Sequence, residues 1–198
     1  MIGLSQLITI NGTFDSQTDG SLKPKGKDSL HILSFTSENI SKTFSYKKKE
    51  AIDFQLINST QLKQIFSQNE FTWVFIQASW CGGCNSSLKK YIKLADSLDQ
   101  IRIVVINQDM RIRSLQHKIF NEGFKSQPYL LDPKEYGTYE PDKQSKFVGE
   151  LTDLGKLVNY NPKGVPHNFF FNRKGELIYY GPNDITSQTL KEKVLKSE

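Results

Sequence analysis

Residues 71–84, FTWVFIQASWCGGC, decide the fold of this 198-residue chain. The first eight of them are almost all apolar, which is typical of a central β-strand buried on both faces. Cys81 and Cys84 follow soon after, with Gly82 and Gly83 between them. Apolar side chains then recur at helical spacing, namely Leu88, Tyr91, Ile92, Ala95 and Leu98. The segment therefore predicts a buried strand, a sharp turn and a helix that starts at the first cysteine.

A CxxC pair occurs in zinc sites, in haem attachment sites and in redox centres, and its surroundings separate these. Cys81 and Cys84 are the only 2 cysteines of the chain, which excludes a four-cysteine zinc site and any larger disulfide framework. Asn85 follows Cys84 where haem attachment needs a histidine. A redox pair and a single structural disulfide remain. The second is weaker, because so short a loop constrains the unfolded chain little.

The start of a helix is a position that activates a cysteine. Free backbone N–H groups and the positive end of the helix dipole stabilise a thiolate there, so we expect Cys81 to be the nucleophile. Cys84 lies one turn further on, and we expect it to be more buried and to resolve the mixed disulfide. Trp80 would flank the sulfur and offer an apolar surface to a partner chain.

The composition divides the chain into two regions. Residues 1–50 are rich in Ser, Thr, Lys and Asn and predict a β-rich N-terminal extension, with a partly disordered arm as the alternative. Residues 51–198 predict an α/β domain with a long connection over about 132–163. The expected strands are 7–10, 30–35, 43–46, 71–78, 101–106, 167–171 and 176–180, and residues 129–131 form a short apolar stretch. One expected helix is capped by Ser59 or Thr60 and a second starts at the cysteines. Further helices are expected over about 112–122, 145–158 and 187–196, with a loop at 23–26.

The bulk numbers exclude several classes of protein. The net charge is +5, and its densest basic run, residues 47–49, indicates a solvated loop and not a nucleic-acid site. No apolar run approaches the roughly 20 residues that span a bilayer, so we expect no transmembrane segment. The first residues lack a positive stretch and a long apolar stretch, so the sequence as given predicts no secretory signal.

A second motif follows about 80 residues after the cysteine pair. Gly164, Val165 and Pro166 precede an apolar strand and a hairpin turn over 169–177. The two motifs in this order resemble the thioredoxin superfamily, and in particular the TlpA-like thiol–disulfide oxidoreductases of the bacterial cell envelope. The resemblance covers roughly 55–196. It implies a thioredoxin-like α/β fold, a central mixed sheet flanked by helices, in addition to the N-terminal extension.

The resemblance also implies a site and a role. Pro166 would be a cis-proline against the CxxC pair, and the backbone of Val165 would hold an extended substrate segment, together with Trp80, Gly82 and Gly83. Protein substrates with disulfides or thiols and a thiol–disulfide electron donor are the implied partners, with no cofactor and no nucleic acid. The implied location is the periplasm or cell envelope, with the cytoplasm as the alternative.

Three positions depart from the family pattern. Thioredoxins carry a buried acid where this chain has Phe75, and many TlpA-like proteins carry a glutamate where it has Ser87. The residue after the cis-proline is commonly threonine, and here it is His167. One hypothesis is that the His167 imidazole lies near the dithiol and replaces the missing acid. The alternative is a ring that points away.

Two other functions remain open from the sequence. Cys81, Cys84 and His167 could supply three ligands for copper or zinc, although we expect no metal because a cis-proline on the sulfurs would obstruct its entry. The chain could also be a redox-inactive binding module whose working surface is 1–50 and 132–163. A peroxiredoxin site is excluded, because residues 78–81 lack the proline and threonine that it needs.

Overall fold

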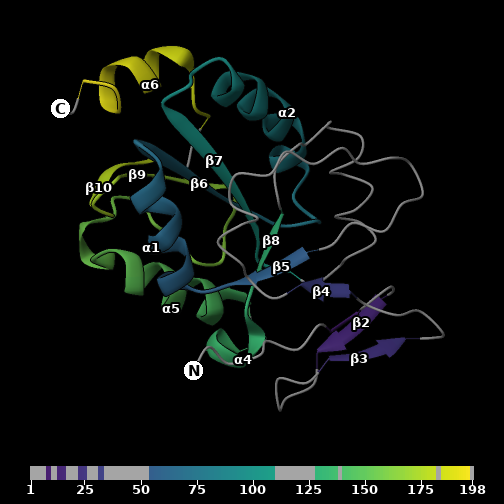
Figure 1. Cartoon of the computed structure of the whole chain (residues 1–198). Coiled ribbons are helices and arrows are strands. Elements are labelled where there is room, and N and C mark those ends of the chain that lie inside the picture. Colours follow the sequence, from purple (N-terminus) through teal and green to yellow (C-terminus); the bar gives the residue numbers. More distant parts are fainter. Residues whose placement is uncertain are drawn as a thin grey trace.

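Eight strands form the central sheet in the order β1-β4-β5-β8-β7-β6-β9-β10, and β2 and β3 form a separate hairpin (Figure 1). The computed structural model describes residues 8–9, 13–16, 22–25, 31–33, 54–109, 128–137, 140–181 and 184–196. The strands are β1 (Ile8–Thr9), β2 (Thr13–Ser16), β3 (Leu22–Lys25), β4 (His31–Leu33), β5 (Phe54–Ile57), β6 (Phe71–Gln77), β7 (Ile101–Asn107), β8 (Tyr129–Leu131), β9 (His167–Asn172) and β10 (Leu177–Gly181). The helices are α1 (Ser59–Gln68), α2 (Gly82–Asp96), α4 (Pro133–Tyr136), α5 (Glu140–Leu151), the 3₁₀ turn η2 (Leu154–Lys156) and α6 (Ser187–Lys193).

Two supersecondary units meet at the centre of the sheet. β6, α2 and β7 form a parallel β–α–β unit. β9 and β10 are antiparallel neighbours and lead into α6, and β9 pairs antiparallel with β6. The resulting order β7-β6-β9-β10, with one helix after β6 and one after β10, is the thioredoxin fold. The fold class that the sequence predicts is confirmed.

The central strand β6 has helices on both sides, which explains its apolar sequence. All seven of its residues are buried, as the continuous apolar run predicts. One face of the sheet packs against α2 and α6, through Trp73 and Phe75 of β6. The other face packs against α1 and α5, through Val74 and Ile76. Figure 1 shows α2 and α6 together above the sheet and α1 and α5 below it.

Most predicted elements of the α/β region are present, but the helix expected at 145–158 is displaced. α5 begins at Glu140 and ends at Leu151. The side chain of Asp153 instead accepts the N–H of Gly155 and starts η2 as a separate turn.

The loop expected at 23–26 is wrong for its first three residues, which lie in β3. Pro24 pairs with Phe14 of β2 in a two-stranded ladder. A proline has no N–H to donate, and it is tolerated here because, among the described strands, β3 pairs with β2 alone. The strand expected at 43–46 and the helix expected at 112–122 lie outside the described residues.

Candidate redox site

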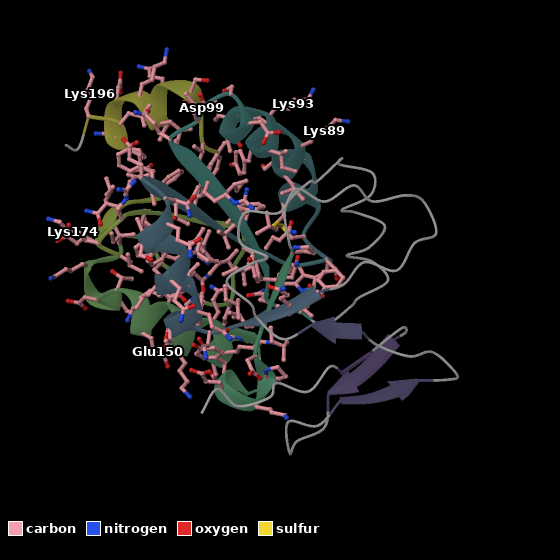
Figure 2. All side chains as sticks on the ribbon, in the orientation of Figure 1. Lys89, Lys93, Asp99, Glu150, Lys174 and Lys196 are labelled. Carbon is pink, nitrogen blue, oxygen red and sulfur yellow. A yellow bond between two sulfur atoms is a disulfide. The ribbon has the colours of Figure 1, made fainter. Side chains whose placement is uncertain are left out.

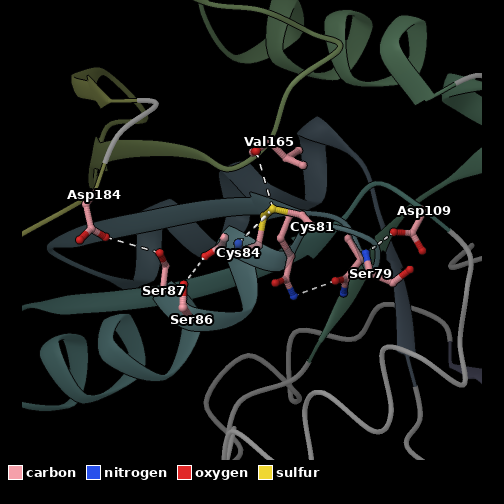
Figure 3. The surroundings of a disulfide bond; sticks show 11 residues. Ser79, Cys81, Cys84, Ser86, Ser87, Asp109, Val165 and Asp184 are labelled. Atoms are coloured by element: carbon pink, nitrogen blue, oxygen red, sulfur yellow. Dashed lines mark hydrogen bonds between the residues drawn. A yellow bond between two sulfur atoms is a disulfide. The ribbon is translucent and has the colours of Figure 1, made fainter.

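Cys81 and Cys84 form a disulfide bond at the start of α2 (Figure 3). Cys81 has extended backbone angles and is the N-cap of the helix, and its sulfur accepts the backbone N–H of Cys84 at 3.0 Å. The residue Cys81 is 7% exposed and Cys84 is 0% exposed. The first cysteine is therefore the one that solvent reaches, in the order that the sequence predicts.

The second motif lies directly against this pair. The carbonyl oxygen of Val165 is 3.7 Å from the sulfur of Cys81, and Figure 3 shows it pointing at the disulfide. The Val165–Pro166 peptide bond is cis, the geometry that the resemblance implies. β9 begins at the next residue. Two segments that are far apart in the sequence thus meet at one sulfur atom.

The rim of the site carries one large side chain and two residues that have none. Trp80 is 47% exposed, although most large apolar side chains of the described residues are buried. Gly82 and Gly83 are exposed, and a Cβ atom added to either would contact nothing within 4 Å. The approach to Cys81 is therefore open on the helix side and apolar beside Trp80.

Phe75 occupies the position where thioredoxins carry a buried acid, and its ring contacts another aromatic side chain. Phe75 is fully buried and packs edge-on against Tyr91 of α2, with ring centroids 5.2 Å apart. Burial raises the pKa of Tyr91, so this phenol stays neutral at physiological pH. No charged group occupies this position, and a proton cannot be taken up there.

A carboxylate does lie beside Ser87, the position where many TlpA-like proteins carry a glutamate, but it comes from another part of the chain. Asp184, in the loop before α6, accepts a long hydrogen bond of 3.4 Å from Ser87 (Figure 3). Tyr91 and Lys90 donate to the same carboxylate at 2.9 and 2.7 Å. Hydrogen bonds from Lys90 and Tyr91 lower the pKa of Asp184. The carboxylate is exposed and bound to the outer face of α2.

Asp109 is a second acidic residue that the sequence reasoning missed. It is buried just beyond the end of β7, and its carboxylate accepts the backbone N–H of Ser79 in the turn before the cysteines (Figure 3). Gln77 and Asn107 are paired in the register of β6 and β7, and the side-chain amide of Gln77 donates a hydrogen bond of 2.8 Å to the side-chain oxygen of Asn107. An acid that follows a parallel strand lies at the same sheet edge as the cysteine turn, and this signal could have identified Asp109.

The hypothesis that places His167 beside the dithiol is wrong in this structure. Its Nδ1 is 2.8 Å from the hydroxyl of Tyr180 and its Nε2 is 3.1 Å from the carbonyl of Asn161. The ring also lies against Tyr160 and shares its face of β9 with Phe169. That face packs against α1 and α5, whereas the cysteines lie on the opposite face of the sheet with α2. Because side chains alternate along a strand, His167 and the cysteines are on different sides of the sheet.

The three ligands considered for copper or zinc are consequently not brought together. Cys81 and Cys84 are bonded to each other, and both ring nitrogens of His167 have partners elsewhere. Within the described ranges, no group of three His, Cys, Asp or Glu side chains could hold a metal ion.

In the same part of the chain, no helix is both long and apolar enough to cross a bilayer.

The strand order and connections are those of the thioredoxin fold, with a CxxC disulfide at the start of α2. No protein-family model and no curated protein sequence matches the chain. Several solved structures are similar to it. StoA from Bacillus subtilis is 22% identical, over 63% of this chain and 81% of that chain, with a TM-score of 0.41.

A thiol:disulfide interchange protein of the thioredoxin family from Chlorobium tepidum is 15% identical, over 78% of this chain and 94% of that chain, with a TM-score of 0.49. A secreted Mycobacterium tuberculosis disulfide oxidoreductase is 12% identical, over 81% and 98% of the two chains, with a TM-score of 0.42. Since these TM-scores are below 0.5, the assignment of the fold rests on the strand order and connections described above.

Proposed function

We propose that the protein is a thiol–disulfide oxidoreductase that exchanges disulfides with protein substrates through Cys81 and Cys84. One observation carries the proposal: the sulfur of Cys81 is the N-cap of α2 and lies 3.7 Å from the carbonyl of Val165, with the buried Cys84 bonded to it. This geometry combines a nucleophile at a helix start, the backbone of the half-buried Val165 and a thiol placed to resolve the mixed disulfide.

The reaction from the dithiol form has two steps. The Cys81 thiolate attacks one sulfur of a substrate disulfide, which forms a mixed disulfide and releases the other substrate sulfur as a thiolate that takes up a proton. Cys84 then loses its proton and attacks the sulfur of Cys81. The Cys81–Cys84 disulfide forms, the second substrate thiol leaves, and two electrons have passed to the substrate. A dithiol donor protein returns the pair to its reduced form.

The substrate segment would lie along Val165 and Pro166 in an extended conformation. Its backbone would pair with the Val165 peptide, and Trp80 would cover its apolar side chains. Gly82 and Gly83 would let its backbone approach the helix start closely. Of the possible locations, the resemblance to TlpA-like proteins favours the periplasm or cell envelope, and cell fractionation with an antibody against the chain would test this.

Reduction of insulin by dithiothreitol tests the activity directly. We expect the wild-type protein to accelerate insulin precipitation and Cys81→Ser to abolish the acceleration. Cys84→Ser should retain the nucleophile and accumulate a mixed disulfide between Cys81 and an insulin chain, detectable by mass spectrometry. Equal rates with wild type, with Cys81→Ser and without protein would contradict the proposal and favour a redox-inactive binding module.

A further inference from the structure

A groove with a basic wall lies between α2 and α6, and the proposed exchange reaction assigns it no role. It has a volume of about 880 Å³. Lys89, Lys90 and Lys93 line it on α2, and Thr186, Ser187 and Gln188 line it at the start of α6. Among the described residues, no carboxylate lines it. We call this feature the basic groove.

Among the described residues, two of the three lysines of the basic groove have no ion-pair partner. Lys90 forms an ion pair of 2.7 Å with Asp184. Lys89 and Lys93 make no ion pair within the described part of the chain, and Figure 2 shows both at the outer side of α2. They are four residues apart and therefore lie on one side of the helix, one turn from each other.

The acidic residues of the neighbouring helices do not neutralise this wall. Asp96 lies three residues beyond Lys93, at the end of α2, and does not line the groove. Glu192 of α6 does not line the groove either, and its carboxylate accepts a hydrogen bond of 2.9 Å from Gln188, which does. The groove therefore presents two ammonium groups opposite hydroxyl and amide groups, a surface that complements carboxylates.

The described surface between the sulfur of Cys81 and the basic groove carries only small side chains. Among the residues of α2 whose side chains the structure describes, those exposed along this path are Gly82, Gly83 and Ser86. A helix rises 1.5 Å per residue, so Lys89 and Lys93 lie roughly 12 and 18 Å along the axis from Cys81. An extended chain covers about 3.3 Å per residue, so these distances correspond to roughly four to six residues.

We infer that the basic groove binds an acidic segment of the protein substrate, located about four to six residues from the cysteine that reacts with Cys81. The inference rests on the proposed function and specifies which substrates the protein prefers. Substrates would be selected by paired carboxylates on the α2 side, while Val165 and Trp80 hold the residues next to the disulfide.

Three matched peptides test the inference on the full chain. Each peptide has one cysteine, which forms a mixed disulfide with 2-mercaptoethanol. The residues at four, five and six positions before and after the cysteine are Glu in the first peptide, Gln in the second and Lys in the third. The second-order rate of oxidation of the reduced protein is measured by acid quenching, alkylation and mass spectrometry. We expect the Glu peptide to react roughly tenfold faster than the Gln peptide, the Lys peptide to be slowest, and the differences to shrink in 0.5 M salt.

Charge exchange provides the decisive variant. The double variant Lys89→Glu/Lys93→Glu should reverse the order, so that the Lys peptide reacts fastest, a gain that a folding defect cannot produce. The control Lys134→Glu/Lys174→Glu makes the same change of net charge on α4 and in the β9–β10 turn, and should keep the wild-type order. Both control lysines are exposed.

The uncharged bis(2-hydroxyethyl) disulfide separates failure of this inference from failure of the proposed function. If the protein reduces it but treats the three peptides alike, the basic groove has no such role. An unchanged order in Lys89→Glu/Lys93→Glu, or a reversal in the control variant as well, would also overturn the inference. If neither this disulfide nor any peptide reacts, the exchange function itself is wrong, and the inference falls with it.

Discussion

Tyr91 and Asp184 are joined by a hydrogen bond of 2.9 Å, in which a phenol of α2 donates to a carboxylate from the loop before α6. The same hydroxyl oxygen accepts the backbone N–H of Ile185 at 3.0 Å. The ring of Tyr91 packs against Trp73 and Phe75 of the central strand. One side chain therefore connects the cysteine helix, the centre of the sheet and the C-terminal loop.

Removal of this hydroxyl should destabilise the fold. We expect Tyr91→Phe to lower the free energy of unfolding by about 1–3 kcal/mol, because the buried N–H of Ile185 would lose its acceptor. Urea unfolding followed by circular dichroism measures the change. Tyr179→Phe is the matched control, since the Tyr179 hydroxyl has no hydrogen bond among the described residues. Equal losses in the two variants would contradict the prediction.

The Asp184 carboxylate should make stability depend on pH in the acid range. Hydrogen bonds from Lys90 and Tyr91 lower the pKa of Asp184 in the folded protein. A carboxyl group of this kind stabilises the fold above its unfolded pKa of about 4, and the contribution is lost as the pH falls through the lower, folded value. We expect urea midpoints measured from pH 6 to pH 2 to fall less steeply for Asp184→Asn than for the wild type. Parallel curves would refute this contribution.

His167 should affect stability near neutral pH without affecting the cysteines. Burial lowers its pKa, so the folded protein binds a proton less readily than the unfolded chain. The unfolded histidine takes up a proton below about pH 6.5, and stability should therefore decrease as the pH falls from 7 to 5. His167→Gln should remove that part of the pH dependence. Thiol alkylation of reduced Cys81 should give the same pH profile in the variant and the wild type, and a shifted profile would contradict the separation of the two faces.

Asp109 should position the turn that carries the nucleophile. Its carboxylate accepts the N–H of Ser79, two residues before Cys81. Asp109→Ala removes the acceptor, and we expect a loss of about 1–3 kcal/mol of stability and slower alkylation of reduced Cys81. Asp109→Asn keeps an acceptor oxygen without the charge and should retain the wild-type rate more closely than alanine does. An alanine variant that matches the wild type in both measurements would exclude a positioning role.

The parts of the site that depend on local sequence could be predicted. An apolar run followed by a CxxC pair specifies a buried strand and a helix start, and Cys81 and Cys84 occupy the expected positions with the expected order of burial. The strand and the helix start need only a few neighbouring residues and one rule of chain geometry. The expectation for Pro166 came instead from the resemblance to the thioredoxin superfamily, whose two motifs follow each other in this order.

The parts that depend on long-range packing could not be predicted in the same way. Nothing near Ser87 in the sequence indicates that Asp184, 97 residues later, provides a carboxylate beside it. The contact exists because α6 follows β10 and packs on the same face as α2. The orientation of His167, in contrast, could have been deduced. Side chains alternate along β9, so His167 lies on the same face as Phe169 and Phe171, the face that packs against α1 and α5. A side chain near the dithiol would have to lie on the opposite face.

The difference in burial between the two sulfurs also determines how the site would be damaged. Peroxide and similar oxidants approach from solvent and act on exposed thiolates, so they would meet Cys81 first. A sulfenic acid formed there has Cys84 as its neighbour, and condensation with that thiol restores the disulfide of this structure. Irreversible overoxidation would then require a second oxidant molecule to reach Cys81 before Cys84 does. Cys84 would thus protect the less deeply buried Cys81, in addition to the resolving role that we propose for it.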